Sequence, residues 1–148
     1  MTSGTPQTDN TKLGNNPQPE QASDKRSPQT SGIFLSVVIP AYNESTRLPK
    51  SLRTVIEYLE SKGTPYEVLV VDDGSSDDTA ALAEQFAQAT PLATPHSTLH
   101  VIRNPHRGKG YAVRTGMLAA QGKYVLYSDA DFSAPIEEVE KLLKYLEG

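Results

Sequence analysis

The stretch "EVLVVDDGSSDD", residues 67–78, decides the fold expected for this chain. Its glutamate is followed by four apolar residues rich in valine, and a short β-branched run bounded by turn residues is typical of a buried strand. A polar turn follows at once and opens on the adjacent carboxylates of Asp72 and Asp73. The next helix is predicted over about 77–89, and Asp77 or a neighbouring serine can cap its start.

The same order of strand, polar turn and helix recurs on both sides of this stretch. Upstream, an apolar run leads into "PAYNE", and the helix after it is predicted to have Ser45 or Thr46 as its N-cap and to end at Gly63. Downstream, two more strands lead into "RNPHRGKG" and "SDADFS". The inner face of the last helix is predicted to include Leu142. The predicted strands are 33–40, 67–71, 99–103 and 124–128, and the predicted helices are about 48–62, 77–89, 109–120 and 135–146.

Strands that alternate with helices predict an α/β fold, with a mostly parallel sheet covered by helices on both faces. Ligands of such sheets bind beyond the carboxyl ends of the strands. The four polar stretches that follow the strands are therefore expected to share one edge of the sheet.

Composition divides the 148 residues into two parts. Residues 1–32 contain Met1, Leu13 and Ala22 as their apolar residues, among many Pro, Gln, Asn, Ser and Thr, and their charges cancel. Such a segment buries too little apolar surface to offset its ordering entropy, so we expect a disordered tail. It has neither the basic start nor the apolar core of a signal peptide. Residues 33–148 are long enough for one modest domain.

Charge and residue usage exclude several classes of function. The chain has no cysteine, which excludes disulfides and thiolate zinc sites and suits a reducing compartment. Its net charge of −4 argues against a nucleic-acid-binding surface. No apolar run approaches the roughly 18 residues of a membrane span. We therefore expect a cytoplasmic protein, or one peripheral at the cytoplasmic face of a membrane.

Asp129 and Asp131 lie one residue apart where the last predicted strand ends. In an extended segment these side chains point the same way, and two carboxylates that face one pocket are costly without a partner. Hard oxygen ligands suit Mg²⁺ or Mn²⁺, which proteins often hold with one or two carboxylates while substrate phosphates complete the shell. The alternative is that Asp129 ends the strand and Asp131 caps the next helix.

Two other turns carry groups that favour the binding of a nucleotide. Asp72 or Asp73, at the mouth of a buried strand, can accept hydrogen bonds from a base or from ribose hydroxyls. The segment "RGKG" at 107–110 exposes backbone at the start of a helix, where anions are favoured, and Lys109 adds positive charge. It is a near miss for the dinucleotide motif G-x-G-x-x-G, because Val113 occupies the third glycine position.

The remaining polar residues are less informative taken singly. Tyr42 could lie against a base, and Glu44 could contact ribose or only the first turn of its helix. The three histidines, His96, His100 and His106, show no spacing typical of metal ligands, and we predict no catalytic role for them.

The combination of these motifs resembles a known family. "VVIPAYNE", "VVDDGSSDDT", "GKGYAVRTGMLAAQG" and "YSDAD", in this order, are similar to the amino-terminal half of a family-two glycosyltransferase with the GT-A fold. The run "RGKGYAVRTGMLAAQGKYVLYSDADFSAPIEE" most resembles the branch that glucosylates dolichyl (polyprenyl) phosphate. Residues 33–148 would then be the Rossmann-like, nucleotide-sugar-binding part of the domain, truncated before its acceptor half.

The resemblance implies roles for individual positions. Asp73, with Asp72 beside it, matches the aspartate that holds the base, and Lys109 lies in the segment along the diphosphate. Asp129 matches the first acid of the D-x-D motif, near ribose and diphosphate, and Asp131 matches the acid bound to the metal. The loop that walls the nucleoside corresponds to Pro40, Tyr42 and Glu44.

The activity implied is inverting, metal-dependent transfer of glucose from UDP-glucose, favoured over GDP-mannose, to a polyprenyl phosphate. The family takes its catalytic base from sequence beyond the D-x-D region, so no residue of this chain is predicted as the base. Three alternatives stay open: a non-catalytic nucleotide-sugar-binding module or inactive fragment, a phosphatase with Asp129 as nucleophile and Asp131 as acid, and a phospho-acceptor receiver domain.

Overall fold

The computed structural model describes residues 32–131 and 138–147. The expected disordered tail, apart from Gly32, lies outside the described residues. All four predicted strands and all four predicted helices are present, with ends that differ by a few residues. The strands are β1 (Leu35–Ala41), β2 (Tyr66–Asp73), β3 (Thr98–Asn104) and β4 (Tyr124–Tyr127), and the helices are α2 (Leu48–Lys62), α3 (Thr79–Ala89), α4 (Lys109–Ala119) and α5 (Glu138–Glu147).

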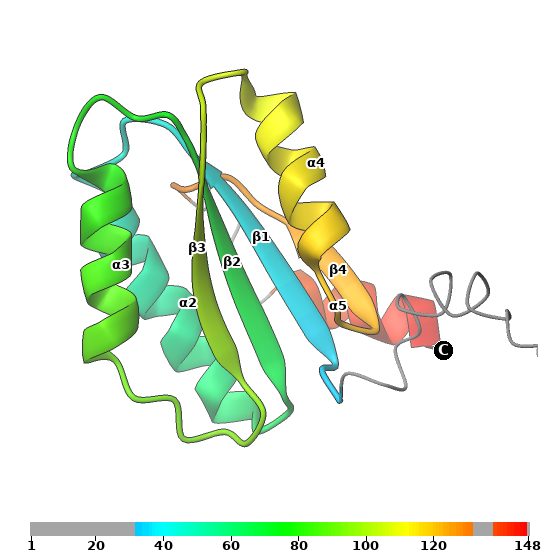
Figure 1. Ribbon diagram of the computed structural model, residues 1–148. Coiled ribbons are helices and arrows are strands. Elements are labelled where there is room, and N and C mark those ends of the chain that lie inside the picture. The colour runs from blue at the N-terminus through cyan, green and yellow to red at the C-terminus, as the bar shows by residue number, and fades with distance from the viewer. Residues whose placement is uncertain (1–31, 132–137, 148) are drawn as a thin grey trace, which may run out of the picture.

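The strands form one sheet in the order β3-β2-β1-β4, and every neighbouring pair is parallel (Figure 1). The two central strands, β1 and β2, are buried along their whole length. This explains their nearly continuous apolar sequences, since a strand covered on both faces has no solvent side for polar residues. The predicted parallel α/β fold is confirmed.

Helices cover both faces of the sheet, with α4 on one face and α2, α3 and α5 on the other (Figure 1). The larger core lies under α2 and α3 and contains Val37, Ile39 and Val70, while α4 packs on Val38 and Val71. A Cβ added to Gly116 of α4 would lie 2.3 Å from Cγ1 of Val38. The absence of a side chain at Gly116 therefore lets α4 lie directly on β1.

Three helix starts differ from the prediction. The N-cap of α3 is Asp78, whose side chain makes no cap hydrogen bond, whereas Asp77 or a neighbouring serine was predicted to cap this helix. The N-cap of α2 is Arg47, and neither Ser45 nor Thr46 caps this helix, so that prediction is wrong. The reason is that other groups hold the turn before α2. The carbonyl of Glu44 accepts a hydrogen bond from the N–H of Leu48 at 2.8 Å, and the hydroxyl of Thr79, on α3, accepts one from the N–H of Glu44 at 2.8 Å.

The last helix begins at Glu138 rather than 135, and the residues at 132–137 lie outside the described part of the chain. Leu142 was predicted to face inward, but its side chain is half exposed, at 52%. On the same helix, Glu140 forms an ion pair with Lys62, the last residue of α2. Across 32–131 and 138–147, every helix is too short or too polar to serve as a membrane-spanning segment.

Candidate functional site

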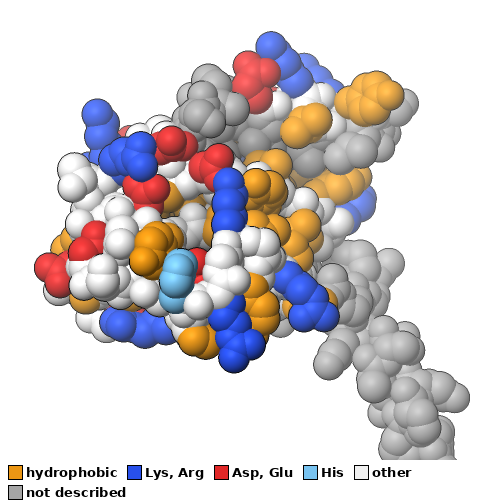
Figure 2. Space-filling model, turned by 90° about the horizontal axis from the view of Figure 1, so that it is seen from above, with side chains coloured by type: hydrophobic (Ala, Val, Ile, Leu, Met, Phe, Trp, Pro, Cys, Tyr) orange, Lys and Arg blue, Asp and Glu red, His pale blue; other side chains and the backbone are white. Residues whose placement is uncertain are grey.

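The loops that follow the four strands meet at the carboxyl edge of the sheet, as the sequence predicts. They enclose a pocket of ≈ 270 Å³, called the edge pocket below. Figure 2 looks down onto this edge and shows acidic side chains gathered beside basic ones. Among the described residues, the pocket is lined by Pro40, Ala41, Tyr42, Glu44, Asp73, Lys109, Asp129, Ala130 and Asp131.

The pocket opens beside β1 because β4 ends early. The pairing of β1 with β4 reaches Val38 opposite Tyr127, and the last bond between them runs from the N–H of Ser128 to the carbonyl of Val38 at 3.0 Å. The backbone nitrogen of Pro40 faces the same side, two residues further on, where β4 has left the sheet. A proline is therefore tolerated in this central strand, because no ladder bond is lost there.

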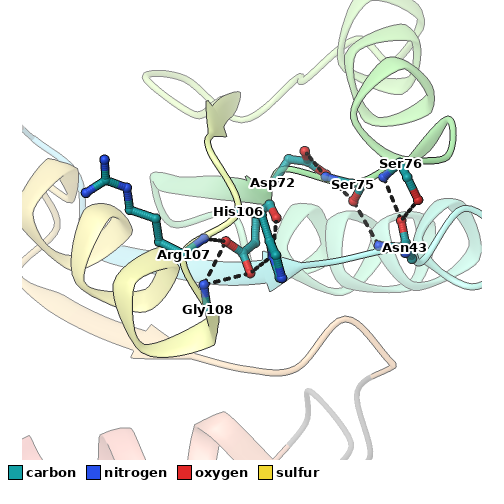
Figure 3. A network of polar contacts seen from close by, with 8 residues as sticks. Asn43, Asp72, Ser75, Ser76, His106, Arg107 and Gly108 are labelled. Carbon is teal, nitrogen blue, oxygen red and sulfur yellow. Dashed lines mark hydrogen bonds and ion pairs between the residues drawn. The ribbon is translucent and has the colours of Figure 1, made fainter.

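The loop after β1 is held by the loop after β2. Asn43 has a positive φ of 52°, a conformation that asparagine adopts more readily than most residues. Its side-chain oxygen accepts from the N–H of Ser76 at 2.9 Å, and its own N–H donates to Oγ of Ser75 at 2.8 Å (Figure 3). These bonds fix the loop on both sides of Asn43 and so place Tyr42 and Glu44 in the edge pocket.

Asp72 and Asp73 do different things, although they are adjacent. Both belong to β2 and both are buried. The Asp72 carboxylate accepts from the N–H of Ser75 at 3.0 Å and from its hydroxyl at 2.6 Å, and it closes the turn (Figure 3). Of the two, Asp73 lines the edge pocket and Asp72 does not.

The Asp73 carboxylate binds the loop between β3 and α4. Its Oδ1 accepts from the N–H of Arg107 at 2.8 Å and from that of Gly108 at 3.1 Å. Its Oδ2 lies 3.1 Å from the N–H nitrogen of Gly108 and 3.1 Å from Nδ1 of His106 (Figure 3). Hydrogen bonds to a charged carboxylate are stronger than neutral ones, so this buried acid anchors the start of α4.

Sequence reasoning missed His106. Its ring stacks on the ring of Tyr42, with centroids 4.3 Å apart and planes at 18°. Its position in the polar stretch "RNPHRGKG", directly after a strand, is a signal that could have placed it at the carboxyl edge. The stacking partner and the contact with Asp73 depend on three separate loops and have no local signature.

Lys109 opens α4 and reaches across the edge pocket to the segment after β4. Its Nζ lies 2.5 Å from Oδ1 of Asp129 and 5.5 Å from the ring centroid of Tyr127. Two hydrogen bonds raise the pKa of Lys109 above its ordinary value. The bond to Asp129 has the larger effect, and the bond to the Tyr127 hydroxyl adds to it. The lysine therefore keeps its positive charge.

Asp131 is linked to the loop after β1 through an arginine. Nη1 of Arg47 lies 3.6 Å from Oδ2 of Asp131. The same guanidinium donates two bonds to the Glu44 carboxylate, at 2.8 and 2.9 Å. Arg47 thus links the D-x-D segment to the loop that carries Tyr42 through its ion pairs with both.

The residues of the edge pocket fit a divalent cation. Four carboxylates and one lysine line it among the described residues, so a nucleoside diphosphate would meet net negative charge there. Within 32–131 and 138–147, no three or more His, Cys, Asp or Glu side chains are grouped to hold an ion. Asp129 and Asp131 carry hard carboxylate oxygens in this pocket, and a cation held by these two side chains would need a bound phosphate or water to complete its shell, as is usual for Mg²⁺.

The family model for glycosyl transferase family 2 matches residues 36–148, which include every residue of the edge pocket. The chain belongs to this family. Its match begins in β1 and includes all four loops of the carboxyl edge.

Dolichyl-phosphate beta-glucosyltransferases are among the relatives of this chain. The one from Drosophila melanogaster is 45% identical over 115 residues, covering 74% of this chain and 34% of that protein. The one from Saccharomyces cerevisiae is 41% identical over 113 residues, covering 75% and 34%, and the one from Homo sapiens is 39% identical over 117 residues, covering 76% and 35%. The chain spans about a third of the length of these curated relatives.

Solved structures agree with the fold. The mannosyltransferase PcManGT of Pyrobaculum calidifontis, in complex with GDP-Man and Mn²⁺, aligns with a TM-score of 0.63 at 28% identity, covering 77% of this chain and 32% of that one. TarS 1–349 of S. aureus, in complex with UDP-GlcNAc, aligns with a TM-score of 0.59 at 23% identity, covering 78% and 31%. The sheet and its helices therefore have the GT-A fold.

Proposed function

We propose that this chain is the donor-binding part of a glycosyltransferase that moves glucose from UDP-glucose to a polyprenyl phosphate, with Mg²⁺ or Mn²⁺ bound. Three lines of reasoning support the proposal. The relatives are dolichyl-phosphate beta-glucosyltransferases, a GT-A enzyme with 28% identity holds GDP-Man with Mn²⁺, and the edge pocket combines groups suited to a base, a diphosphate and a cation.

The observation that carries the proposal is the composition of the edge pocket. Tyr42 and Asp73 lie on the side formed by β1 and β2, and they would meet the uracil ring. Lys109, at the start of α4, would face the diphosphate, with the backbone of Gly108 beside it. Asp129 and Asp131 would hold the cation on the far side, next to the diphosphate.

The reaction proposed is a single displacement with inversion. An oxygen of the acceptor phosphate attacks the anomeric carbon, and the bond from that carbon to the diphosphate oxygen breaks, with its electron pair staying on UDP. The cation, when bound, supplies Lewis-acid stabilisation of the charge that grows on the leaving diphosphate. Lys109 adds a fixed positive charge beside the same group.

The acceptor determines how much base catalysis the reaction needs. A phosphate acceptor is already anionic and requires little proton removal, whereas a hydroxyl acceptor would depend on a general base. We assign none of the described residues as such a base. The carboxylates of the edge pocket are each engaged with a basic group or a backbone N–H, as their contacts show.

The proposal is tested by calorimetric titration of the chain with UDP, GDP, UDP-glucose and GDP-mannose, each with and without Mn²⁺. We expect the uridine ligands to bind more tightly than the guanosine ligands, and Mn²⁺ to strengthen the binding of the diphosphates. Uridine without phosphates serves as the control, since its binding should not respond to Mn²⁺. A preference for GDP would overturn the assignment of the donor, and no binding of any nucleotide would overturn the proposal.

A further inference from the structure

His106 links three parts of the edge pocket that lie far apart in the sequence. It comes from the loop between β3 and α4, its ring nitrogen contacts Asp73 at the end of β2, and its ring face covers Tyr42 after β1. The side chain of His106 is 57% exposed, whereas that of Asp73 is 5% exposed. The histidine therefore packs from the solvent side against two residues of the edge pocket, Tyr42 and Asp73.

The contacts of Nδ1 determine which ring nitrogen carries a proton. Nδ1 lies 3.0 Å from the backbone oxygen of Asp73 and 3.1 Å from its Oδ2. Both oxygens are acceptors, so Nδ1 must be the donor. The carboxylate of Asp73 is thereby held from one side by the ring and from the other by the N–H groups of Arg107 and Gly108.

The backbone of His106 is also in close contact with the turn after β2. Gly74 follows Asp73 with a positive φ of 68°, and a Cβ at this position would lie 2.5 Å from the backbone nitrogen of His106. The turn after β2 therefore packs directly against the backbone of His106. With its backbone fixed in this way, the ring has a defined position from which it can orient its neighbours.

The stacked pair gives Tyr42 a rigid support. Tyr42 is 43% exposed, and its ring stacks on that of His106 in an arrangement that aromatic pairs favour. With His106 against it, the Tyr42 ring is held in one orientation at the mouth of the pocket. Without that support, the ring could turn freely about the end of its loop.

We propose that His106 is a positioning residue for the nucleobase of the donor. It holds the Asp73 carboxylate and the Tyr42 ring in the arrangement that receives a uracil ring, and so sets the affinity for uridine rather than for the diphosphate. This inference rests on the proposed function, because it takes the edge pocket to be the donor site.

The test separates the two contacts of the ring with three variants. His106→Phe keeps a ring on Tyr42 but has no Nδ1–H, His106→Asn keeps an N–H donor but has no ring, and His106→Ala has neither. His100→Phe is the control, because His100 is exposed on β3 and lines a different hollow, between β2, β3 and the end of α4. Uridine and UDP are titrated by NMR and calorimetry, and pyrophosphate with Mn²⁺ is titrated in parallel.

We expect His106→Ala to weaken the binding of uridine and of UDP by about tenfold, which corresponds to roughly 1.4 kcal/mol. The same variant should weaken the binding of pyrophosphate by less than about twofold. The Phe and Asn variants should each lose less affinity for uridine and UDP than the Ala variant does. In the wild type, long-range ¹H–¹⁵N spectra should show a proton on Nδ1 of His106. The His100→Phe control should match the wild type throughout.

Three results would overturn the inference: unchanged uridine affinity in His106→Ala, equal losses for uridine and pyrophosphate, or an unprotonated Nδ1. In each of these cases the wild type still binds UDP, so the proposed function stands. If the wild type binds neither uridine nor UDP, the proposed function fails, and the inference fails with it.

Discussion

The ammonium group of Lys109 lies 2.5 Å from Oδ1 of Asp129. This ion pair joins the first residue of α4 to the segment that follows β4. Both side chains are partly exposed, so the pair contributes little to folding stability. The pair instead affects the charge of the edge pocket, because the lysine neutralises a carboxylate that we assign to the metal.

Replacing Lys109 by methionine should therefore change the binding of cation and nucleotide in opposite directions. With Lys109→Met we expect Mn²⁺ alone to bind at least as tightly as in the wild type, because Asp129 no longer has a competing partner. UDP in the presence of Mn²⁺ should bind about tenfold more weakly, because the positive charge beside the diphosphate is lost. Electron paramagnetic resonance of free Mn²⁺ and calorimetry with UDP measure the two effects.

Lys141→Met is the matched control, because Lys141 lies on α5 and pairs with Glu138 at 3.5 Å. It should leave both affinities unchanged. Full UDP affinity in Lys109→Met would show that this lysine does not face the diphosphate.

Asp73→Ala should affect both stability and binding. The substitution leaves the partly buried N–H groups of Arg107 and Gly108 without their acceptor, and a lost hydrogen bond costs about 0.5–1.5 kcal/mol. Urea unfolding should show that loss, and uridine should bind more weakly with or without Mn²⁺. Asp78→Ala is the control, since Asp78 is exposed and its side chain makes no cap hydrogen bond. Equal urea midpoints for Asp73→Ala and Asp78→Ala would refute the anchoring role of Asp73.

Two glycines of α4 should respond in opposite ways to alanine. Gly116→Ala introduces a methyl group 2.3 Å from Cγ1 of Val38 and should destabilise the fold by about 1–3 kcal/mol, because β1 and α4 must separate. Gly110→Ala meets no atom within 4 Å and should be neutral or stabilise by up to about 1 kcal/mol, through a less flexible unfolded chain. Urea unfolding of both variants measures the difference. A Gly116→Ala protein as stable as Gly110→Ala would contradict the close approach of α4 to β1.

Asp77 should make stability depend on pH in the acid range. The hydrogen bond from the Thr79 hydroxyl lowers the pKa of Asp77 to about 2 in the folded protein, from an ordinary value of 3.8. A lowered pKa contributes stability that is complete above about pH 4 and is lost as the pH falls through about 2. The difference in Tm between the wild type and Asp77→Asn should therefore shrink between about pH 5 and about pH 3. A difference that stays constant or grows over this range would contradict the assignment.

Local patterns in the sequence were enough to predict the sheet and its covering helices. Continuous valine-rich runs can be buried on both faces, and each is followed by a polar turn and a helical spacing of apolar residues, so the parallel topology follows from connection rules. The convergence of the four loops follows from that topology. This is why Tyr42, Lys109 and Asp131, predicted from three different motifs, line one pocket.

The contacts that hold the site together could not be predicted in this way. The Tyr42–His106 stack and the Asn43–Ser76 bond join residues more than thirty positions apart, and their partners depend on loop conformation. The cap of α2 was predicted wrongly for the same reason, because a hydroxyl from Thr79 satisfies the turn before the helix. Long-range polar contacts leave no periodic signal in a single sequence.

The central claim, that the acids after β4 hold a cation that in turn holds the diphosphate, is tested most directly by titrating UDP into the wild type and into Asp131→Asn, with and without Mn²⁺. We predict that Mn²⁺ strengthens UDP binding to the wild type by about tenfold or more, and that this gain is absent in Asp131→Asn while metal-free binding is retained. An equal gain from Mn²⁺ in both proteins would contradict the claim.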